Sequence, residues 1–251
     1  MEEIAIIGVG CKLPGADDIN QFWRVLQNGE NHVLEVPSDR WNLEAFYDPD
    51  PNAPGKTYVR RAGFIKNHDS WDNKVYGVND FEASQMDPQQ RFVLDCCFKA
   101  MENAGITRKS IDDSNTGVYI GVMNSDYKSL QSSNSENMNN YTLTGTSTSI
   151  VAARISFAFN LHGPAMSLDT ACSSSLLAIH LAAQALREGD CDMALAGGVN
   201  SLMAPEIFVQ LSKARMASPT GYCQAFSSKA DGYARGEGAG ILLLKRLKDV
   251  S

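Results

Sequence analysis

Short apolar runs alternate along this chain with longer segments of helical periodicity, a pattern typical of an α/β domain with a largely buried sheet. Each apolar run is rich in Ile, Val, Leu and Ala and has the length of a strand. The predicted strands are residues 4–9, 117–123, 165–168, 193–199 and 240–245. We therefore expect a fold of the α/β class built on these five runs.

Three helices have clear boundaries in the sequence. The first, residues 19–28, carries apolar side chains at helical spacing and is followed by a glycine. The second begins after Asp87, a good N-cap, with Pro88 at the first helical position, and extends to Gly105. The third, residues 174–187, is apolar on nearly every face, which predicts a buried helix.

Two segments fit neither a strand nor a helix. In the long loop at about residues 36–75, prolines and scattered aromatic residues interrupt any periodicity. We expect this 36–75 loop to pack on the surface as an insertion and not to act as a linker. Residues 131–140 are polar and rich in Ser and Asn, which predicts an exposed, mobile loop. Without an internal repeat, residues 1–251 are predicted to form one domain.

Composition and charge exclude several classes of protein. With 43% hydrophobic and 20% charged residues, the chain is typical of globular proteins. The 29 acidic and 22 basic side chains give a net charge of -7, and the longest basic run is Arg60-Arg61, which argues against a nucleic-acid partner. No segment has the pattern of a signal peptide or a membrane span. We expect a soluble cytoplasmic protein.

The six cysteines form neither a CxxC pair nor a Cys/His ligand pattern. The sequence therefore predicts no metal site and no disulfide framework. Packing explains four of the thiols, which lie within or beside apolar runs: Cys11, Cys96, Cys97 and Cys191. Cys223 follows a turn, and its role stays open.

Cys172 is different because it lies at a corner between a short apolar strand and a helix. A thiol at a helix N-terminus is surrounded by unpaired backbone N–H groups and the positive end of the macrodipole, which favour thiolate over thiol. Ala171 and the serines at 173–175 are small, so they permit a sharp turn and leave room for a long substrate. The nucleophile elbow of hydrolases solves a similar problem with glycines. The corner therefore indicates a nucleophile, although a buried packing role is the common alternative for a single cysteine.

The segment 169–175, Asp-Thr-Ala-Cys-Ser-Ser-Ser, resembles the active-site signature of β-ketoacyl synthases, particularly the ketosynthase domains of type I polyketide synthases. Further segments resemble this family in the same order and cover essentially the whole chain: residues 3–15, 36–41, 47–51, 54–58, 86–91, 153–156 and 230–238. The resemblance implies the N-terminal half of a thiolase-like fold, with a mixed, mostly parallel five-stranded sheet and a buried nucleophile helix. Two departures, Phe226-Ser227 and Ser218-Pro-Thr-Gly221, replace the usual Phe-Asp and Ser-Pro-Asp-Gly, so the local loops are expected to differ.

The resemblance also implies a reaction. Cys172 would take an acyl chain from the phosphopantetheine arm of an acyl carrier protein, with its own backbone N–H as an oxyanion donor. The carbanion from a decarboxylated malonyl-carrier would then attack the acyl group, in polyketide or fatty acid biosynthesis. No tightly bound cofactor is implied, and the expected partners are the carrier protein, a C-terminal ketosynthase half and a second copy bound through residues 163–169.

The family places two catalytic histidines and a supporting lysine in the C-terminal half, which would follow Ser251. None of the four histidines of this chain matches those motifs: His32, His68, His162 and His180. The chain in isolation is therefore expected to condense little or nothing.

The sequence also allows four other interpretations. The segment 8–10, Gly-Val-Gly, follows a strand as in a dinucleotide-binding loop, but Leu13 and Pro14 do not fit that pattern. The segment 125–128 matches the Ser-x-x-Lys of penicillin-binding enzymes, yet no Lys-Thr-Gly follows it. A thiolase would share the fold and a cysteine nucleophile. A non-catalytic truncated dimerisation partner or scaffold is the alternative of a different class.

Overall fold

The computed structural model describes residues 2–133 and 135–250 and contains a five-stranded sheet in the order β1-β7-β6-β4-β5. The strands are β1 (Ile4–Lys12), β4 (Thr116–Val122), β5 (Ala165–Leu168), β6 (Met193–Asn200) and β7 (Gly238–Arg246). β4 pairs in parallel with β5 and β6, while β7 is antiparallel to both β6 and β1. Four strands therefore run in one direction and β7 runs against them, which confirms the predicted mixed, mostly parallel sheet.

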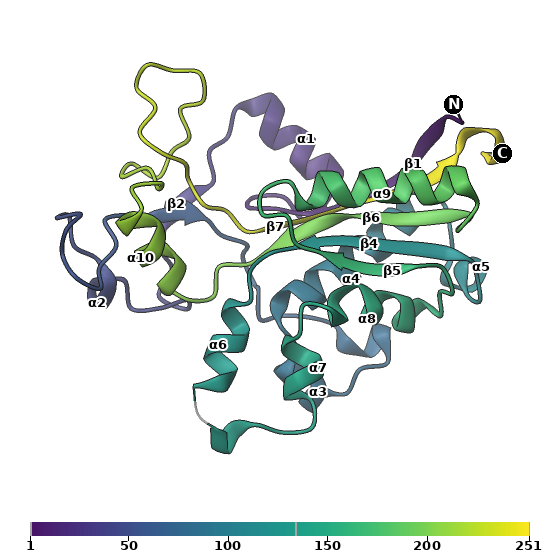
Figure 1. The fold of residues 1–251 in the computed structure, drawn as a ribbon, viewed down its shortest axis with the longest axis horizontal. Coiled ribbons are helices and arrows are strands. Elements are labelled where there is room, and N and C mark those ends of the chain that lie inside the picture. Colours follow the sequence, from purple (N-terminus) through teal and green to yellow (C-terminus); the bar gives the residue numbers. More distant parts are fainter. Residues whose placement is uncertain (1, 134, 251) are drawn as a thin grey trace.

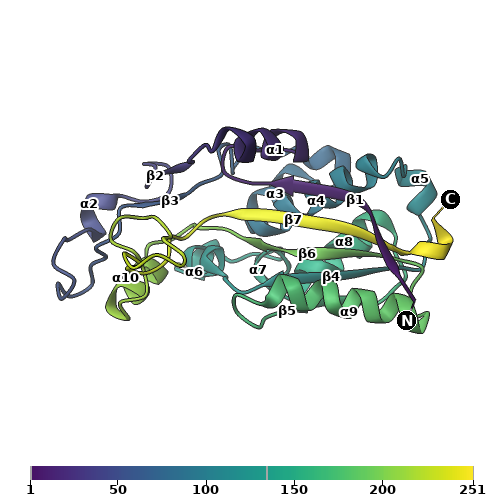
Figure 2. The same cartoon turned by 90° about the horizontal axis from the view of Figure 1, so that it is seen from above.

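Helices cover both faces of this sheet (Figures 1 and 2). α4 (Pro88–Asn103) and α8 (Ile150–Phe159) pack on one face, and α9 (Ser174–Glu188) packs on the other. The larger hydrophobic core lies between the sheet and α4 with α8, where Phe92, Ile120 and Leu243 are buried. α4 begins as the sequence predicts, because the Asp87 carboxylate accepts a hydrogen bond from the Gln89 backbone N–H at 2.8 Å.

The burial of α9 is confirmed for one face only. Ala178, Ala182 and Leu186 are fully buried against the sheet. On the opposite side Leu176 is 71% exposed, and Leu177 and neighbouring apolar residues are only partly covered. The predicted burial of α9 against the sheet is therefore confirmed, while its outer face is exposed among the described residues.

Glycines on β1 explain how α4 approaches the sheet so closely. A Cβ on Gly8 would lie 2.1 Å from the Ala100 carbonyl oxygen, and one on Gly10 would lie 2.0 Å from the Cys96 oxygen. β1 also continues to Lys12 without turning into a helix. These two glycines serve helix–strand packing, and the geometry of a dinucleotide-binding loop is not formed.

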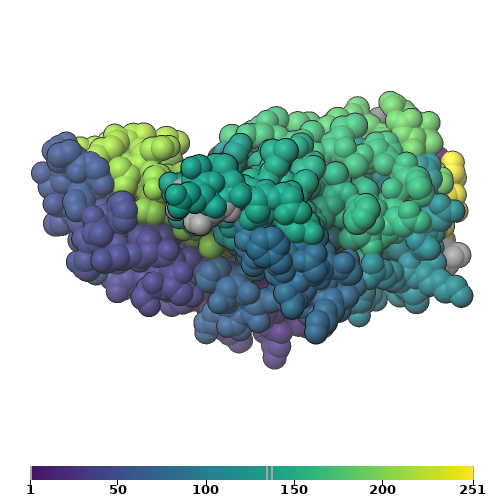
Figure 3. All heavy atoms as spheres, turned by 90° about the horizontal axis from the view of Figure 1, so that it is seen from below, coloured from purple at the N-terminus to yellow at the C-terminus, as the bar shows by residue number. Residues whose placement is uncertain are grey.

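The 36–75 loop is packed, as the sequence predicts, and it builds a second core. Trp41 contacts Phe64 and Phe208, with 5.2 Å between the ring centroids of Trp41 and Phe208. Phe208 belongs to α10 (Glu206–Lys213), which was not predicted. Around this core lie a short helix and an antiparallel pair of strands, α2 (Leu43–Phe46), β2 (Val33–Glu35) and β3 (Arg61–Gly63). The loop and the α10 region lie side by side at one end of the molecule (Figure 3).

The remaining elements are short. They are α1 (Ile19–Asn28), η1 (Asn73–Tyr76), α3 (Asp80–Gln85), α5 (Arg108–Ile111), α6 (Asp126–Ser132), η2 (Ser135–Asn137), α7 (Thr142–Thr146) and η3 (Leu247–Asp249). The predicted polar loop at 131–140 is instead partly helical, with the end of α6 and all of η2 inside it. Asn134 lies outside the described residues. In the described part of the chain, no helix is both long and apolar enough to cross a membrane.

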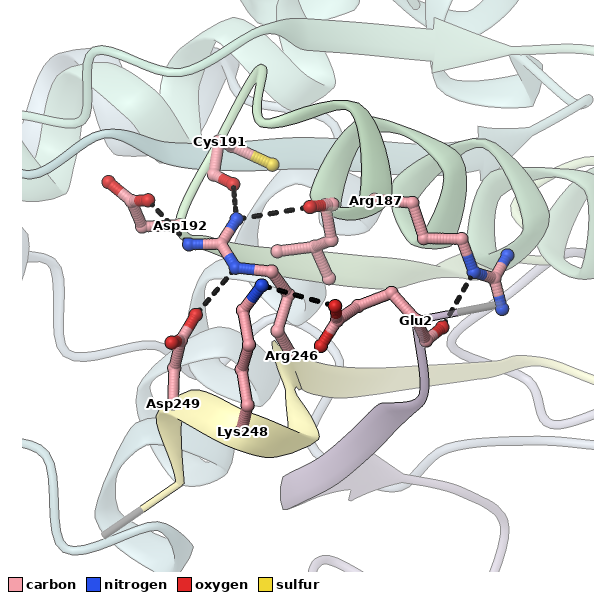
Figure 4. A network of polar contacts seen from close by, with 8 residues as sticks. Glu2, Arg187, Cys191, Asp192, Arg246, Lys248 and Asp249 are labelled. Carbon is pink, nitrogen blue, oxygen red and sulfur yellow. Dashed lines mark hydrogen bonds and ion pairs between the residues drawn. The ribbon is translucent and has the colours of Figure 1, made fainter.

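β1 starts and β7 ends at the same end of the sheet, where Arg246 organises a polar network (Figure 4). Its guanidinium donates to the backbone oxygens of Leu186 and Cys191 at 3.0 and 2.9 Å and pairs with Asp192 at 2.8 Å. A fourth contact joins it to Asp249. Arg246 therefore ties the end of β7 to the end of α9 and to the connection that leads into β6.

Candidate active site

Cys172 lies at the predicted corner between β5 and α9. β5 ends at Leu168, and Cys172 directly precedes Ser173, the N-cap residue of α9. Ala171 has φ of 56°, a left-handed conformation that costs a non-glycine residue about 1–2 kcal/mol. The Cys172 side chain is exposed. A strained turn therefore presents an accessible thiol beside the start of a helix, as the nucleophile hypothesis requires.

Side chains within the turn itself hold this conformation. The buried Ser174 hydroxyl accepts a hydrogen bond from the Thr170 N–H at 2.8 Å and donates one to the Ala171 oxygen at 2.6 Å. The Asp169 carboxylate accepts from the Ala171 N–H at 3.0 Å. The backbone on both sides of Ala171 is thereby fixed before any substrate arrives.

Two glycines let the start of α9 approach the sheet. A Cβ on Gly121, in β4, would lie 2.6 Å from the Ser174 carbonyl carbon and the Ser175 nitrogen. A Cβ on Gly198, in β6, would lie 2.7 Å from the Ser175 Cβ. The position of Cys172 relative to β4 and β6 thus depends on the absence of side chains at these two points.

A cavity of about 470 Å³ opens beside Cys172. It lies where β4 and β6 end and α9 begins, and residues 233–240 form its opposite side. We call residues 233–238 the wall turn. The Asn200 side chain donates to the Gly236 oxygen at 2.7 Å and accepts a hydrogen bond from Asn124. These two asparagines connect the ends of β4 and β6 to the wall turn.

Tyr233, at the start of the wall turn, lies near the thiol. Burial raises the pKa of Tyr233; the nearby Arg235 guanidinium opposes this rise, and the electrostatic interaction with Cys172 adds to it. Tyr233 therefore stays a neutral phenol, able to donate a hydrogen bond at the mouth of the cavity.

The other cysteines differ from Cys172 in their surroundings. Burial raises the pKa of Cys96 to about 12 and that of Cys191 to about 11, and it also raises the pKa of Cys11 and Cys97. These four thiols are buried, as the sequence predicts. Cys223 is exposed, but it lies outside the cavity, where its sulfur accepts a hydrogen bond from the Ala234 N–H.

No histidine lines the part of the cavity that the structure describes. His68 is buried in the 36–75 loop, and burial lowers its pKa. His162 pairs with Asp113 at 2.9 Å on the surface, and His180 is exposed on α9. The segment 125–128 of the penicillin-binding pattern does not line the cavity either. Among the described residues, no group of three His, Cys, Asp or Glu side chains could hold a metal ion.

Comparison with known proteins agrees with this geometry. The profile of the family described as "Beta-ketoacyl synthase, N-terminal domain" matches residues 1–250. The chain belongs to this family. The ketosynthase signature around Cys172 thus coincides with the corner and cavity found in the fold, and the dinucleotide-binding and penicillin-binding interpretations are rejected.

Relatives of this ketosynthase chain are polyketide synthases. It is 45% identical over 250 residues to the phenolphthiocerol synthesis polyketide synthase type I Pks15/1 of Mycobacterium bovis, covering 99% of this chain and 12% of the relative. It is 44% identical over 250 residues to the pikromycin polyketide synthase component PikAII of Streptomyces venezuelae, covering 99% of this chain and 7% of the relative. The chain therefore spans a small part of these proteins.

Solved structures confirm the thiolase-like ketosynthase fold. The oxazolomycin ketosynthase domain OzmH KS7 of Streptomyces albus JA3453 superposes with a TM-score of 0.93 at 41% identity, covering 99% of this chain and 43% of that one. The ketosynthase from module 6 of the bacillaene synthase of Bacillus subtilis 168 gives 0.87 at 39% identity, with coverages of 98% and 40%.

The sequence pointed to the corner at Cys172 but not to the other side of the cavity. Asn124 and Asn200 lie at or just beyond the ends of two buried strands, and this position is a usable signal because ligands of parallel sheets bind beyond the carboxyl ends of strands. The glycine-rich segment 230–238 was recognised only as a family motif. Its place in the lining of the cavity beside Cys172 was not predicted.

Proposed function

We propose that this chain is the nucleophile-bearing half of a β-ketoacyl-acyl carrier protein synthase that acts in polyketide or fatty acid biosynthesis. One observation carries the proposal: the exposed Cys172 thiol sits on a strained turn at the start of α9 and opens into a cavity of about 470 Å³. A cavity of this size accommodates a small-molecule substrate. The exposed thiol on a fixed turn favours catalysis over a scaffold role.

The proposed first step is an acyl transfer. The Cys172 thiolate adds to the thioester carbonyl carbon, the bond from that carbon to the carrier sulfur breaks, and the carrier's phosphopantetheine thiol leaves with the proton that Cys172 gave up. The tetrahedral oxyanion needs preorganised donors, and the Cys172 backbone N–H beside the start of α9 is the proposed one. Ser174 and Asp169 would keep this N–H in place by fixing the turn.

Condensation needs groups beyond these. Decarboxylation of malonyl-carrier produces an enolate that requires charged or N–H donors, and no histidine lines the described cavity. We therefore propose a C-terminal ketosynthase half and an acyl carrier protein as partners. A homodimer through residues 163–169 is also proposed, because β5 forms an edge of the sheet and Met166 is 44% exposed there.

Acylation of the purified chain by an acyl-pantetheine thioester tests the proposal. Peptide mass spectrometry should find the acyl group on Cys172 and not on Cys223, which is also exposed and serves as an internal control. Cys172→Ala should lose the label, and Cys223→Ser should keep it. Iodoacetamide or cerulenin should likewise modify Cys172 ahead of the other five thiols. Equal modification of all six would refute the proposal and favour a structural fragment.

A further inference from the structure

The Glu237 carboxylate, in the wall turn, is fully buried and joins three separate segments of the chain. One oxygen accepts hydrogen bonds from Arg40 at 2.8 Å and from the Ile65 N–H at 2.7 Å, and the other accepts from the Leu202 N–H at 2.8 Å. Arg40 and Ile65 belong to the 36–75 loop, and Leu202 follows β6. The carboxylate thus fixes the wall turn against two other parts of the molecule.

Arg40 provides the only positive charge within ion-pairing distance of Glu237 among the described residues. The Arg40 side chain is 1% exposed, and the same terminal nitrogen also donates to the Ile65 oxygen at 3.0 Å. An unpaired charge at such depth is strongly unfavourable, so each partner requires the other. The two side chains form one unit, which we call the Arg40–Glu237 clamp.

Backbone contacts place the clamp directly behind the cavity. The Gly63 N–H donates to the Arg235 oxygen at 3.0 Å, and the Glu237 N–H donates to the Gly63 oxygen at 2.8 Å. Arg235, Gly236 and Glu237 themselves line the cavity beside Cys172. A displacement of the 36–75 loop therefore moves the cavity side that faces the thiol.

We propose that Arg40 and Glu237 are positioning residues that hold the wall turn at the distance from Cys172 that a bound acyl chain requires. The proposal rests on the proposed acyl transfer and adds to it that the 36–75 loop sets acyl-chain selectivity. Neither residue is expected to touch the reacting atoms. Loss of the clamp should impair long acyl chains, which must fit along the wall turn, more than short ones.

The 36–75 loop offers a matched control. Arg60 also makes ion pairs, with Glu35 at 2.7 Å and Glu44 at 3.0 Å, but these lie on the surface. Surface ion pairs contribute little, so Arg60→Met removes an arginine from the same loop without loosening the wall turn. Arg40→Met and Glu237→Gln remove one charge each from the buried clamp, and Arg40→Lys restores the charge.

The experiment uses the full chain and compares two reactions of Cys172. Alkylation by iodoacetamide, a small reagent, should stay within about twofold of the native rate in every variant. Acyl transfer from octanoyl-pantetheine should fall about tenfold in Arg40→Met and Glu237→Gln, and transfer from acetyl-pantetheine should fall much less. Arg60→Met should change neither rate, and Arg40→Lys should recover part of the octanoyl rate.

Three outcomes would overturn the proposal: an unchanged octanoyl-to-acetyl ratio in both clamp variants, a parallel loss of alkylation and acylation, or failure of both variants to fold, which would make the pair purely structural. If the native chain accepts no acyl group at all, the proposed function fails separately. Amide hydrogen exchange then tests whether the clamp holds the wall turn. The exchange rate at residues 233–238 must rise in Glu237→Gln and stay unchanged in Arg60→Met.

Discussion

Replacing Gly121 with alanine adds one methyl group where β4 meets the start of α9. That Cβ would lie 2.6 Å from two backbone atoms, the Ser174 carbonyl carbon and the Ser175 nitrogen, whereas ordinary contact begins at 3.4 Å. Backbone atoms cannot rotate out of the way as a side chain can. The two segments must therefore separate by about 0.8 Å, since interiors are close-packed.

This separation moves Cys172 as well, because Ser174 holds the turn through Thr170 and Ala171. Overpacking of this kind lowers the free energy of unfolding by about 1–3 kcal/mol. A misplacement near 1 Å costs about 100-fold in a reaction that depends on position. We expect Gly121→Ala to lose about 2 kcal/mol of stability and at least about tenfold in the rate of Cys172 acylation.

Urea unfolding and acylation followed by mass spectrometry measure the two effects. Gly240→Ala is the matched control, because Gly240 lines the same cavity but a Cβ there meets no atom within 4 Å. Equal acylation rates for both variants and the native chain would refute the argument that the β4–α9 contact positions the thiol.

Two further predictions concern stability. Burial raises the pKa of Asp87 to about 6. The folded chain therefore keeps a proton that the unfolded chain releases. As a result, the free energy of unfolding falls as pH rises from about 4 to about 6. The Asp87→Asn side chain cannot titrate, so the variant does not lose stability in this way. The free energy of unfolding of the variant minus that of the native chain should rise by about 1 kcal/mol between about pH 5 and pH 7. A difference that does not change with pH would contradict this. Arg246→Met, which removes bonds to Leu186 and Cys191, should lose about 2 kcal/mol in urea unfolding, and the exposed control Lys248→Met at most about 0.5 kcal/mol. Equal losses in these two variants would contradict the role of Arg246.

Local sequence signals were sufficient for the elements that carry them. The apolar runs located all five strands of the main sheet, although β1 continues past Val9 to Lys12, because pairing with β7 extends there. Asp87 and Pro88 marked the start of α4 correctly. The corner at Cys172 was predictable because a short strand, small residues and a helix follow one another directly in the chain.

Features made by distant segments were not predictable. Trp41 packs on Phe208, which lies more than 160 positions later in the sequence. No sequence pattern near either residue indicates this contact. The same holds for Glu237, whose carboxylate meets Arg40 and Leu202 only after the 36–75 loop and β7 have come together. The exposed outer face of α9 was missed for a different reason. Apolar composition indicates that a helix face can be buried, but it does not identify the segment that covers that face.

The last strand of the sheet is also an inner one, and this order has a consequence for biosynthesis. β7 separates β1 from β6, with Ile4 opposite Arg246 and Lys12 opposite Ala239. A nascent chain that has not yet emerged from the ribosome past Arg246 keeps β1 without its partner strand until β7 follows, more than 220 residues later. Such an edge is prone to aggregate, so we expect ribosome-stalled chains ending before residue 238 to associate with chaperones.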